Sequence, residues 1–116
     1  MNPLNYASLP ASQRLQSSGI VIETEAGWYK IFRPGCHSFD MVLSMRSGNE
    51  KFYGDNYPAP SMAEVWRELP DSFIEKRTDH YYCSIALLSA PIFPDENPTD
   101  ALINLLIWTR KEANHA

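Results

Sequence analysis

Four residues of this chain have side chains of the kinds that bind transition metals: Cys36, His37, His80 and Cys83. Two thiolates and two imidazoles form a donor set that tetrahedral zinc sites use. The spacing argues against such a site, because residues three apart on a strand point to opposite faces of a sheet. His80 and Cys83 could share one ion only if the strand began after His80. We therefore predict no metal site, and we interpret the four residues as surface histidines and buried small thiols.

The segment around Cys36 also has the residue types of a nucleophilic site. Cys36, His37 and Asp40 supply a nucleophile, a base and an orienting acid. Cys83 is expected to face the core, where a thiol is inert, whereas Cys36 follows a turn. Neither cysteine lies in a local nucleophile signature, so we predict no catalytic residue and no cofactor. A small enzyme or ligand-binding protein that uses the Cys36/His37/Asp40 region is the alternative function.

Composition and charge narrow the class of protein. The 116 residues suit a single domain, residues 1–116, with residues 1–7 as a loosely ordered N-terminal arm. The formal net charge of -4 gives no attraction for nucleic acid or anionic lipid, and no apolar run approaches the ~18 residues of a membrane span. We expect a cytoplasmic protein with free thiols and without nucleic-acid or membrane partners. Nucleic-acid binding would need Arg33, Arg46 and Lys51 on one sheet face.

The last helix is the element around which we expect the fold to be organised. Asn97 suits the N-cap, Pro98 suits the first helical position, and Asp100 places negative charge at the positive end of the helix dipole. The pattern predicts a helix over residues 97–111 that lies across a sheet. Its core-facing stripe has the spacing of one helix face and consists of Ala101, Leu102, Leu105, Leu106 and Thr109. Asp95, Glu96 and Asp100 are interpreted as a solvated helix start.

The last helix carries apolar side chains on a second face as well. Ile103, Ile107 and Trp108 lie largely opposite the core-facing stripe. A helix this apolar must be covered on two sides, by another segment or by a subunit contact. We therefore predict that Ile103, Ile107 and Trp108 form a candidate interaction surface for self-association or for a protein partner.

The remaining pattern predicts an α+β domain, in which about three helices pack on one small antiparallel sheet of three to four strands, in the order αββ(β)αβα. Helices are predicted over 8–18 and over 61–69, where Ser61 and Glu64 spell a capping box. Strands are predicted over 28–33 and 39–46, around a type II turn at Pro34-Gly35, with a short strand at 51–53. Residues 72–76 read as a short turn and 90–97 as an extended connection. The strand over 80–88 is predicted as a central strand that pairs with the two around Pro34-Gly35.

Three segments resemble parts of a known group of proteins. They are Ser18–Ala26, Tyr57–Pro70 and Asn97–Trp108. Read together, they are similar to small uncharacterised proteins of bacteriophages, prophages and mobile elements of gut-type bacteria. The resemblance implies a fold, a mobile-element ancestry and a cytoplasmic protein, and it brings no catalytic residues to transfer. Residues 33–53 have no distinctive match.

These observations favour one function. We predict a small non-enzymatic protein-interaction module that associates with itself or with another protein. The contact would use the apolar excess of the last helix and the edge of the sheet.

Overall fold

The structure is a computed structural model that describes residues 2–32, 34–35, 38–46, 56–85 and 90–115, with no side-chain description beyond residue 112. It confirms the α+β class. In chain order, the elements are η1 (Pro3–Asn5), α1 (Leu9–Ser17), β1 (Ala26–Phe32), β2 (Phe39–Met45), β3 (Tyr57–Pro58), α2 (Met62–Arg67), β4 (Ser72–Lys76), β5 (Tyr81–Ile85), β6 (Phe93–Asp95) and α3 (Pro98–His115). The predicted strand at 51–53 lies outside the described residues.

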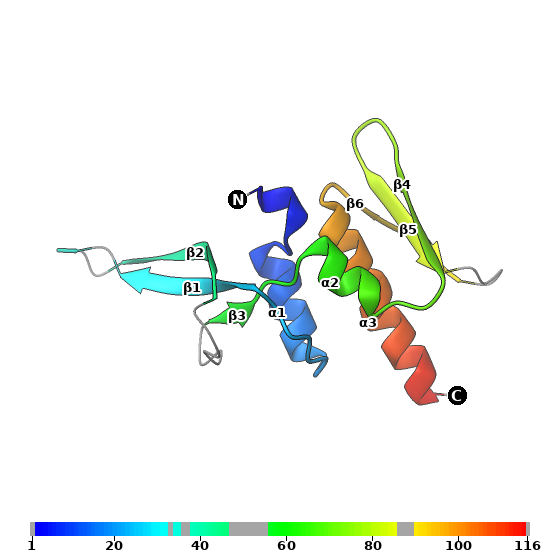
Figure 1. Ribbon diagram of the computed structural model, residues 1–116, viewed down its shortest axis with the longest axis horizontal. Coiled ribbons are helices and arrows are strands. Elements are labelled where there is room, and N and C mark those ends of the chain that lie inside the picture. The colour runs from blue at the N-terminus through cyan, green and yellow to red at the C-terminus, as the bar shows by residue number, and fades with distance from the viewer. Residues whose placement is uncertain (1, 33, 36–37, 47–55, 86–89, 116) are drawn as a thin grey trace.

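The last helix, α3, runs through the middle of the molecule (Figure 1). It contacts β5 and β6 on one side, and η1, α1 and α2 on the other. The sheet that contains β1 and β2 lies at the far end of the longest axis, with the β1–β2 hairpin directed away from the helices (Figure 1). The extents of 55 × 34 × 24 Å reflect this projection.

The described strands form two antiparallel sheets, β2-β1-β3 and β4-β5-β6. The prediction of one sheet is therefore wrong in this respect, because β5 pairs with β4 and β6 and not with the strands around Pro34-Gly35. Residues 72–76 form strand β4 instead of a turn. The short link from β4 to β5, closed by the Arg77 N–H on the His80 carbonyl at 2.9 Å, brings these neighbours together at little entropic cost. The extended connection over 90–97 supplies β6.

β1 and β2 pair antiparallel along their whole lengths. Phe32 lies opposite Phe39, and Trp28 lies opposite Leu43. Gly35 has a φ of +75°, as the third residue of a type II turn after Pro34 requires. Glycine is favoured there because a Cβ is strained at this φ.

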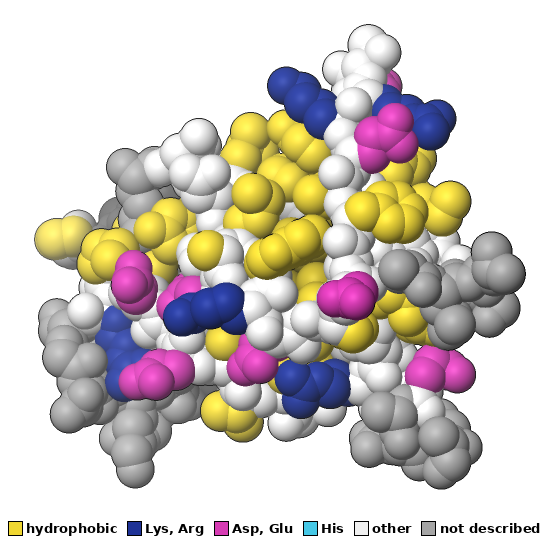
Figure 2. Space-filling view, turned by 45° about the vertical axis from the view of Figure 1, so that its right-hand side comes forward, with side chains coloured by type: hydrophobic (Ala, Val, Ile, Leu, Met, Phe, Trp, Pro, Cys, Tyr) yellow, Lys and Arg dark blue, Asp and Glu magenta, His cyan; other side chains and the backbone are white. Residues whose placement is uncertain are grey.

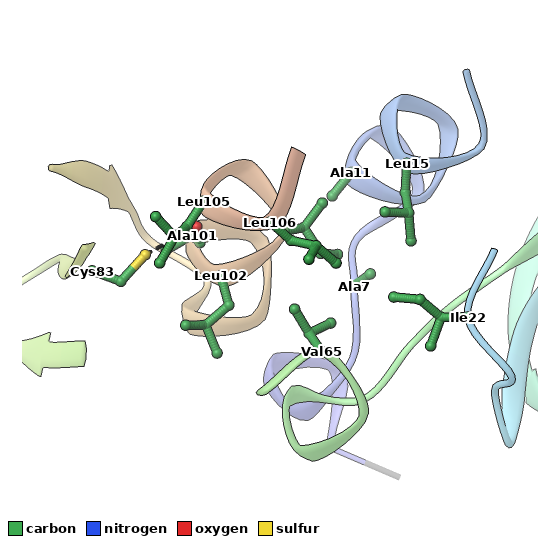
Figure 3. Close-up of a cluster of buried hydrophobic side chains, with 11 residues drawn as sticks. Ala7, Ala11, Leu15, Ile22, Val65, Cys83, Ala101, Leu102, Leu105 and Leu106 are labelled. Atoms are coloured by element: carbon green, nitrogen blue, oxygen red, sulfur yellow. Dashed lines mark hydrogen bonds between the residues drawn. The ribbon is translucent and has the colours of Figure 1, made fainter. Parts of the chain in front are cut away.

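The core gathers around α3 (Figure 3). Leu106 points toward the side of Ala7 and Val65, while Cys83 reaches Ala101 from the opposite side (Figure 3). Each buried leucine contributes about 1.5–3 kcal/mol through removal of its apolar surface from water. The members of this cluster are Ala7, Ala11, Leu15, Ile22, Val65, Cys83, Ala101, Leu102, Ile103, Leu105 and Leu106.

The predicted helix starts are present. Asn97 Oδ1 accepts from the Thr99 and Asp100 N–H groups at 2.8 and 3.3 Å, which caps α3. In α2, Ser61 Oγ accepts from the Glu64 N–H at 3.2 Å, and Glu64 Oε1 accepts from the Ser61 N–H at 2.7 Å. These two bonds form the predicted capping box. Both helices therefore begin where the sequence places them.

The N-terminal residues are held against the start of α3. Where the sequence predicts a loose arm, the Leu4 carbonyl accepts from Thr99 Oγ1 at 3.1 Å, and the Tyr6 carbonyl accepts from Asn97 Nδ2 at 3.2 Å. Ala7 is buried, and its carbonyl accepts from Trp28 Nε1 at 2.9 Å. Polar side chains of α3 and β1 thus provide partners for this backbone.

Candidate interaction surface

The residues predicted as the interaction surface of the last helix do not lie together on the outside. Ile103 has an exposed fraction of 0%, so it belongs to the core and this part of the prediction is corrected. Ile107 is half-buried and packs against the core cluster. Trp108 is half-buried, with its ring 6.4 Å from that of Phe93 in β6. Neighbouring elements cover α3 on both sides, with β5 and β6 on one side and η1, α1 and α2 on the other. The helix pattern alone does not reveal this.

A group of exposed large apolar side chains lies instead on the β1–β2 hairpin. Phe32 is 65% exposed and Met45 is 51% exposed, values that are unusual for side chains of this size. Ile31, Phe39 and Val42 are also exposed. β2 confirms the strand predicted over 39–46, but its residues do not alternate between buried and exposed, and every one of them is exposed or half-buried.

Exposed apolar side chains occur on both faces of the hairpin. The register places Phe32, Phe39 and Met45 on one face, and it places Ile31 and Val42 on the other. The Phe32 and Phe39 rings meet edge to face, with centroids 6.2 Å apart. A two-stranded hairpin cannot bury both of its faces by itself, so this region has apolar surface to offer to a partner.

The Lys30 side chain lies over the aromatic pair. The Lys30 ammonium is 4.0 Å from the centre of the Phe39 ring and 5.5 Å from that of Phe32. This cation–π contact contributes about 0.5–1 kcal/mol at an exposed site.

The outer edge of β2 is a second feature of the hairpin. Among the described residues, β2 pairs only with β1, and no described strand lies beside its other edge. The seven residues of β2 include no proline or lysine, two residue types that often protect an edge strand from pairing. The hairpin therefore combines exposed side chains with an edge that can accept a further strand.

An apolar groove of about 660 Å³ lies beside α2. Met62 and Trp66 are exposed along it, and Ile74 of β4 lines it as well. Figure 2 shows hydrophobic side chains gathered across the middle of one face, with charged side chains around them. Met62 and Trp66 share helical spacing with Val65 and Leu69, yet of these four residues only Val65 and Leu69 pack on the core. The helix of six residues is too short to bury its whole apolar stripe.

The residues with metal-binding or nucleophilic side chains do not form a site. Cys83 is a free, buried thiol whose Sγ lies 3.0 Å from the Ala101 carbonyl oxygen. Burial, with a smaller contribution from the Asp95 carboxylate, raises the pKa of this thiol to about 12, which keeps it protonated and unreactive. His80 Nδ1 is 3.2 Å from Asp79 Oδ1 at the start of β5. No group of three metal-binding side chains occurs in the part of the chain that the structure describes.

Several residues that the sequence suggests for metal binding, catalysis or nucleic-acid binding lie outside the described residues. Cys36 and His37 are among these, and so are Arg33 and Lys51 of the basic cluster that nucleic-acid binding would need. Asp40 is half-buried on β2, opposite Ile31.

Asp100 differs from its predicted environment. It is 6% exposed, and its Oδ1 accepts from the Ser8 N–H at 2.8 Å, so it is not part of a solvated helix start. Burial raises the pKa of the Asp100 carboxyl, while the hydrogen bonds from Ser8 act in the opposite direction. The carboxyl joins the starts of α1 and α3, a contact between residues 92 positions apart that the sequence does not signal.

Comparison of the chain with protein-family models, curated proteins and solved structures gives no match. Within the described residues, every helix is too short or too polar to cross a lipid bilayer.

Proposed function

We propose that this chain is a non-enzymatic protein-interaction module that binds a protein partner, or another copy of itself, through the β1–β2 hairpin. The observation that carries the proposal is the exposure of large apolar side chains on both faces of the hairpin. In the proposal, the module is cytoplasmic and of phage or mobile-element origin, as the sequence resemblance implies.

The chemistry of the hairpin suits a protein partner. Phenylalanine and methionine are among the residues enriched at the centres of protein interfaces, where charged residues are depleted. Covering Phe32 and Phe39 would remove apolar surface from water at about 25 cal/mol per Å². The net charge of -4 gives no support to nucleic acid as the occupant.

The test compares two variants of the protein purified gently from the cells that produce it. The hairpin variant carries Phe32→Ser and Phe39→Ser, which remove two exposed rings. The control variant carries Phe73→Ser, which removes one exposed ring from β4 in the other sheet. Native mass spectrometry reports which chains remain bound to each.

We expect the wild-type protein and the Phe73→Ser control to keep a second protein chain, of the same or another sequence. The hairpin variant should lose it while its circular dichroism spectrum stays unchanged. The proposal fails if the hairpin variant keeps the same bound chain, or if the wild-type protein is a monomer at every concentration.

A further inference from the structure

We propose that the partner of the hairpin is a second copy of this chain, joined through antiparallel pairing of the two β2 strands about a two-fold axis at Val42. This inference rests on the proposed function and names its partner. It would extend the described sheet β2-β1-β3 into one continuous sheet across both copies. A symmetric contact of this kind uses the same surface on both subunits.

The polarity of β2 is the first argument. From Phe39 to Met45 the residues read apolar, polar, apolar, apolar, apolar, polar, apolar, and this order is the same in both directions about Val42. A two-fold axis at Val42 therefore places apolar residues opposite apolar ones and polar residues opposite polar ones. The pairs between the copies are Phe39–Met45, Asp40–Ser44, Met41–Leu43 and Val42–Val42.

The direction of the backbone groups is the second argument. The Arg46 N–H donates to the Glu25 carbonyl at 2.7 Å, so even-numbered residues of β2 direct their backbone groups toward β1. On β1, the Ala26 carbonyl and the Lys30 N–H bond on the side away from β2, which agrees with this alternation. The odd-numbered residues of β2 consequently present their N–H and carbonyl groups at the outer edge.

The proposed axis brings these outer groups into register. Met41 lies opposite Leu43 of the second copy, and Phe39 lies opposite Met45, so each pair can exchange two backbone hydrogen bonds. Val42 meets Val42 as a pair without hydrogen bonds, in which the side chains are closest. An axis between two residues would instead place outward-directed groups against inward-directed ones.

Charge and side-chain contacts agree with the same axis. Asp40 lies opposite Ser44 of the second copy and not opposite another aspartate, so the symmetry creates no directly opposed like charges. Met45 comes beside Phe39 of the second copy, and both are exposed in the single chain. Moving the axis by one residue would place Val42 opposite Asp40 or Ser44, which loses the match in polarity.

The small area of the β2–β2 interface indicates a weak dimer. Seven paired residues from each copy form a smaller interface than the ~1,600 Å² of a standard stable complex. We therefore expect a reversible dimer whose population rises with protein concentration.

Variants with one introduced cysteine test the register directly, in a Cys36→Ser background that keeps only the buried Cys83 of the native cysteines. Pairs without hydrogen bonds hold their Cα atoms about 4.5 Å apart, within the range that a disulfide spans. Under mild oxidation, Val42→Cys should form a covalent dimer. Asp40→Cys and Ser44→Cys should each stay monomeric alone and cross-link to one another when mixed. The inference is overturned if Val42→Cys forms covalent dimer no faster than Asp40→Cys or Ser44→Cys alone.

A proline on the outer edge gives an independent measurement. Met41→Pro removes an outward N–H, a position that edge strands tolerate, and should keep β1–β2 pairing. Sedimentation should show the wild-type mass rising from 13.2 kDa toward twice that value with concentration, and Met41→Pro should remain at the monomer mass. Equal dimerisation of the folded Met41→Pro chain and the wild type would contradict the inference.

The outcomes separate this inference from the proposed function. If the Phe32→Ser and Phe39→Ser variant loses a protein of different sequence while Val42→Cys does not cross-link, the hairpin is an interaction site and the second copy is not its occupant. If Val42→Cys cross-links in the proposed register, both stand.

Discussion

The last helix and the β1–β2 hairpin both have apolar side chains on two faces, yet these side chains are buried on the helix and exposed on the hairpin. Around α3, the elements η1, α1, α2, β5 and β6 cover the helix, and even Ile103 is fully buried. The hairpin extends along the longest axis, away from those elements, and Phe32 remains 65% exposed (Figure 1). The comparison shows that an apolar excess marks an interface only where the fold leaves it uncovered. The same sequence signal therefore produces core in one region and a candidate contact in the other.

The largest expected effect comes from removing a core side chain of α3. Leu106→Ala should lower the free energy of unfolding by about 2–5 kcal/mol, because the buried leucine leaves a cavity that its neighbours fill only partly. The matched change on the hairpin, Ile31→Ala, removes a half-exposed side chain and should cost less than about 1 kcal/mol. Urea unfolding of monomer at low concentration measures both. Equal losses would mean that the hairpin and the helix are covered alike.

The cap of α3 should have the next largest effect. Asn97→Ala removes the acceptor of the Thr99 and Asp100 N–H groups and the donor to the Tyr6 carbonyl. We expect a loss of about 0.5–2 kcal/mol in the free energy of unfolding, with the N-terminal amides exchanging faster. Asn56→Ala is the control on the hairpin side, because its Oδ1 accepts a single bond, from the Lys30 N–H. If Asn97→Ala is as mild as the control, the cap does not hold the N-terminal segment.

The Asp100 carboxyl should give the central region a distinct pH dependence. Its folded-state pKa is raised above the ordinary value of 3.8, so the folded state holds a proton that the unfolded state has already released. This protonation contributes its full stabilisation below a pH of about 3.8. The stabilisation is lost as the pH rises through the raised pKa. As the pH rises through that interval, the free energy of unfolding of the wild type should therefore fall relative to that of Asp100→Asn. An unchanged difference across this range would show that the carboxyl titrates normally.

We expect the smallest change in the free energy of unfolding from removal of the Lys30 ammonium. Lys30→Met keeps a stem of similar size and removes the ammonium 4.0 Å from the Phe39 ring centre, and we expect a loss of about 0.5–1 kcal/mol or less. Lys76→Met, on exposed β4, is the matched control. Unfolding curves at two salt concentrations would check the assignment, because a loss that disappears in high salt indicates a general charge effect.

The local patterns of the sequence could be read with considerable success. Ser8, Ser61 and Asn97 cap the helices that follow them, because a short polar side chain meets free N–H groups within three residues. Ala11 and Leu15 face the core at helical spacing. Each of these signals involves residues close together in the chain.

The candidate site was only partly predictable. The edge of a sheet was part of the predicted surface, and the period-two pattern of 39–46 defines the faces of β2. The preference for Ile103, Ile107 and Trp108 failed at Ile103, because helix periodicity shows which residues share a face but not how many elements pack on it. The exposure of Phe32 has no signal in the sequence, where an aromatic residue in a strand reads as core.

What the sequence by itself determined is the set of elements with short-range causes: the caps, the turn at Pro34-Gly35, the strand β2 and the α+β class. Only the tertiary structure decided that the strands divide into two sheets, that Asp100 is buried against the N–H of Ser8, and that the hairpin projects from the body. These outcomes depend on contacts between residues far apart in the chain. Such contacts form only when they lower the free energy of the whole fold, and no local pattern records that balance.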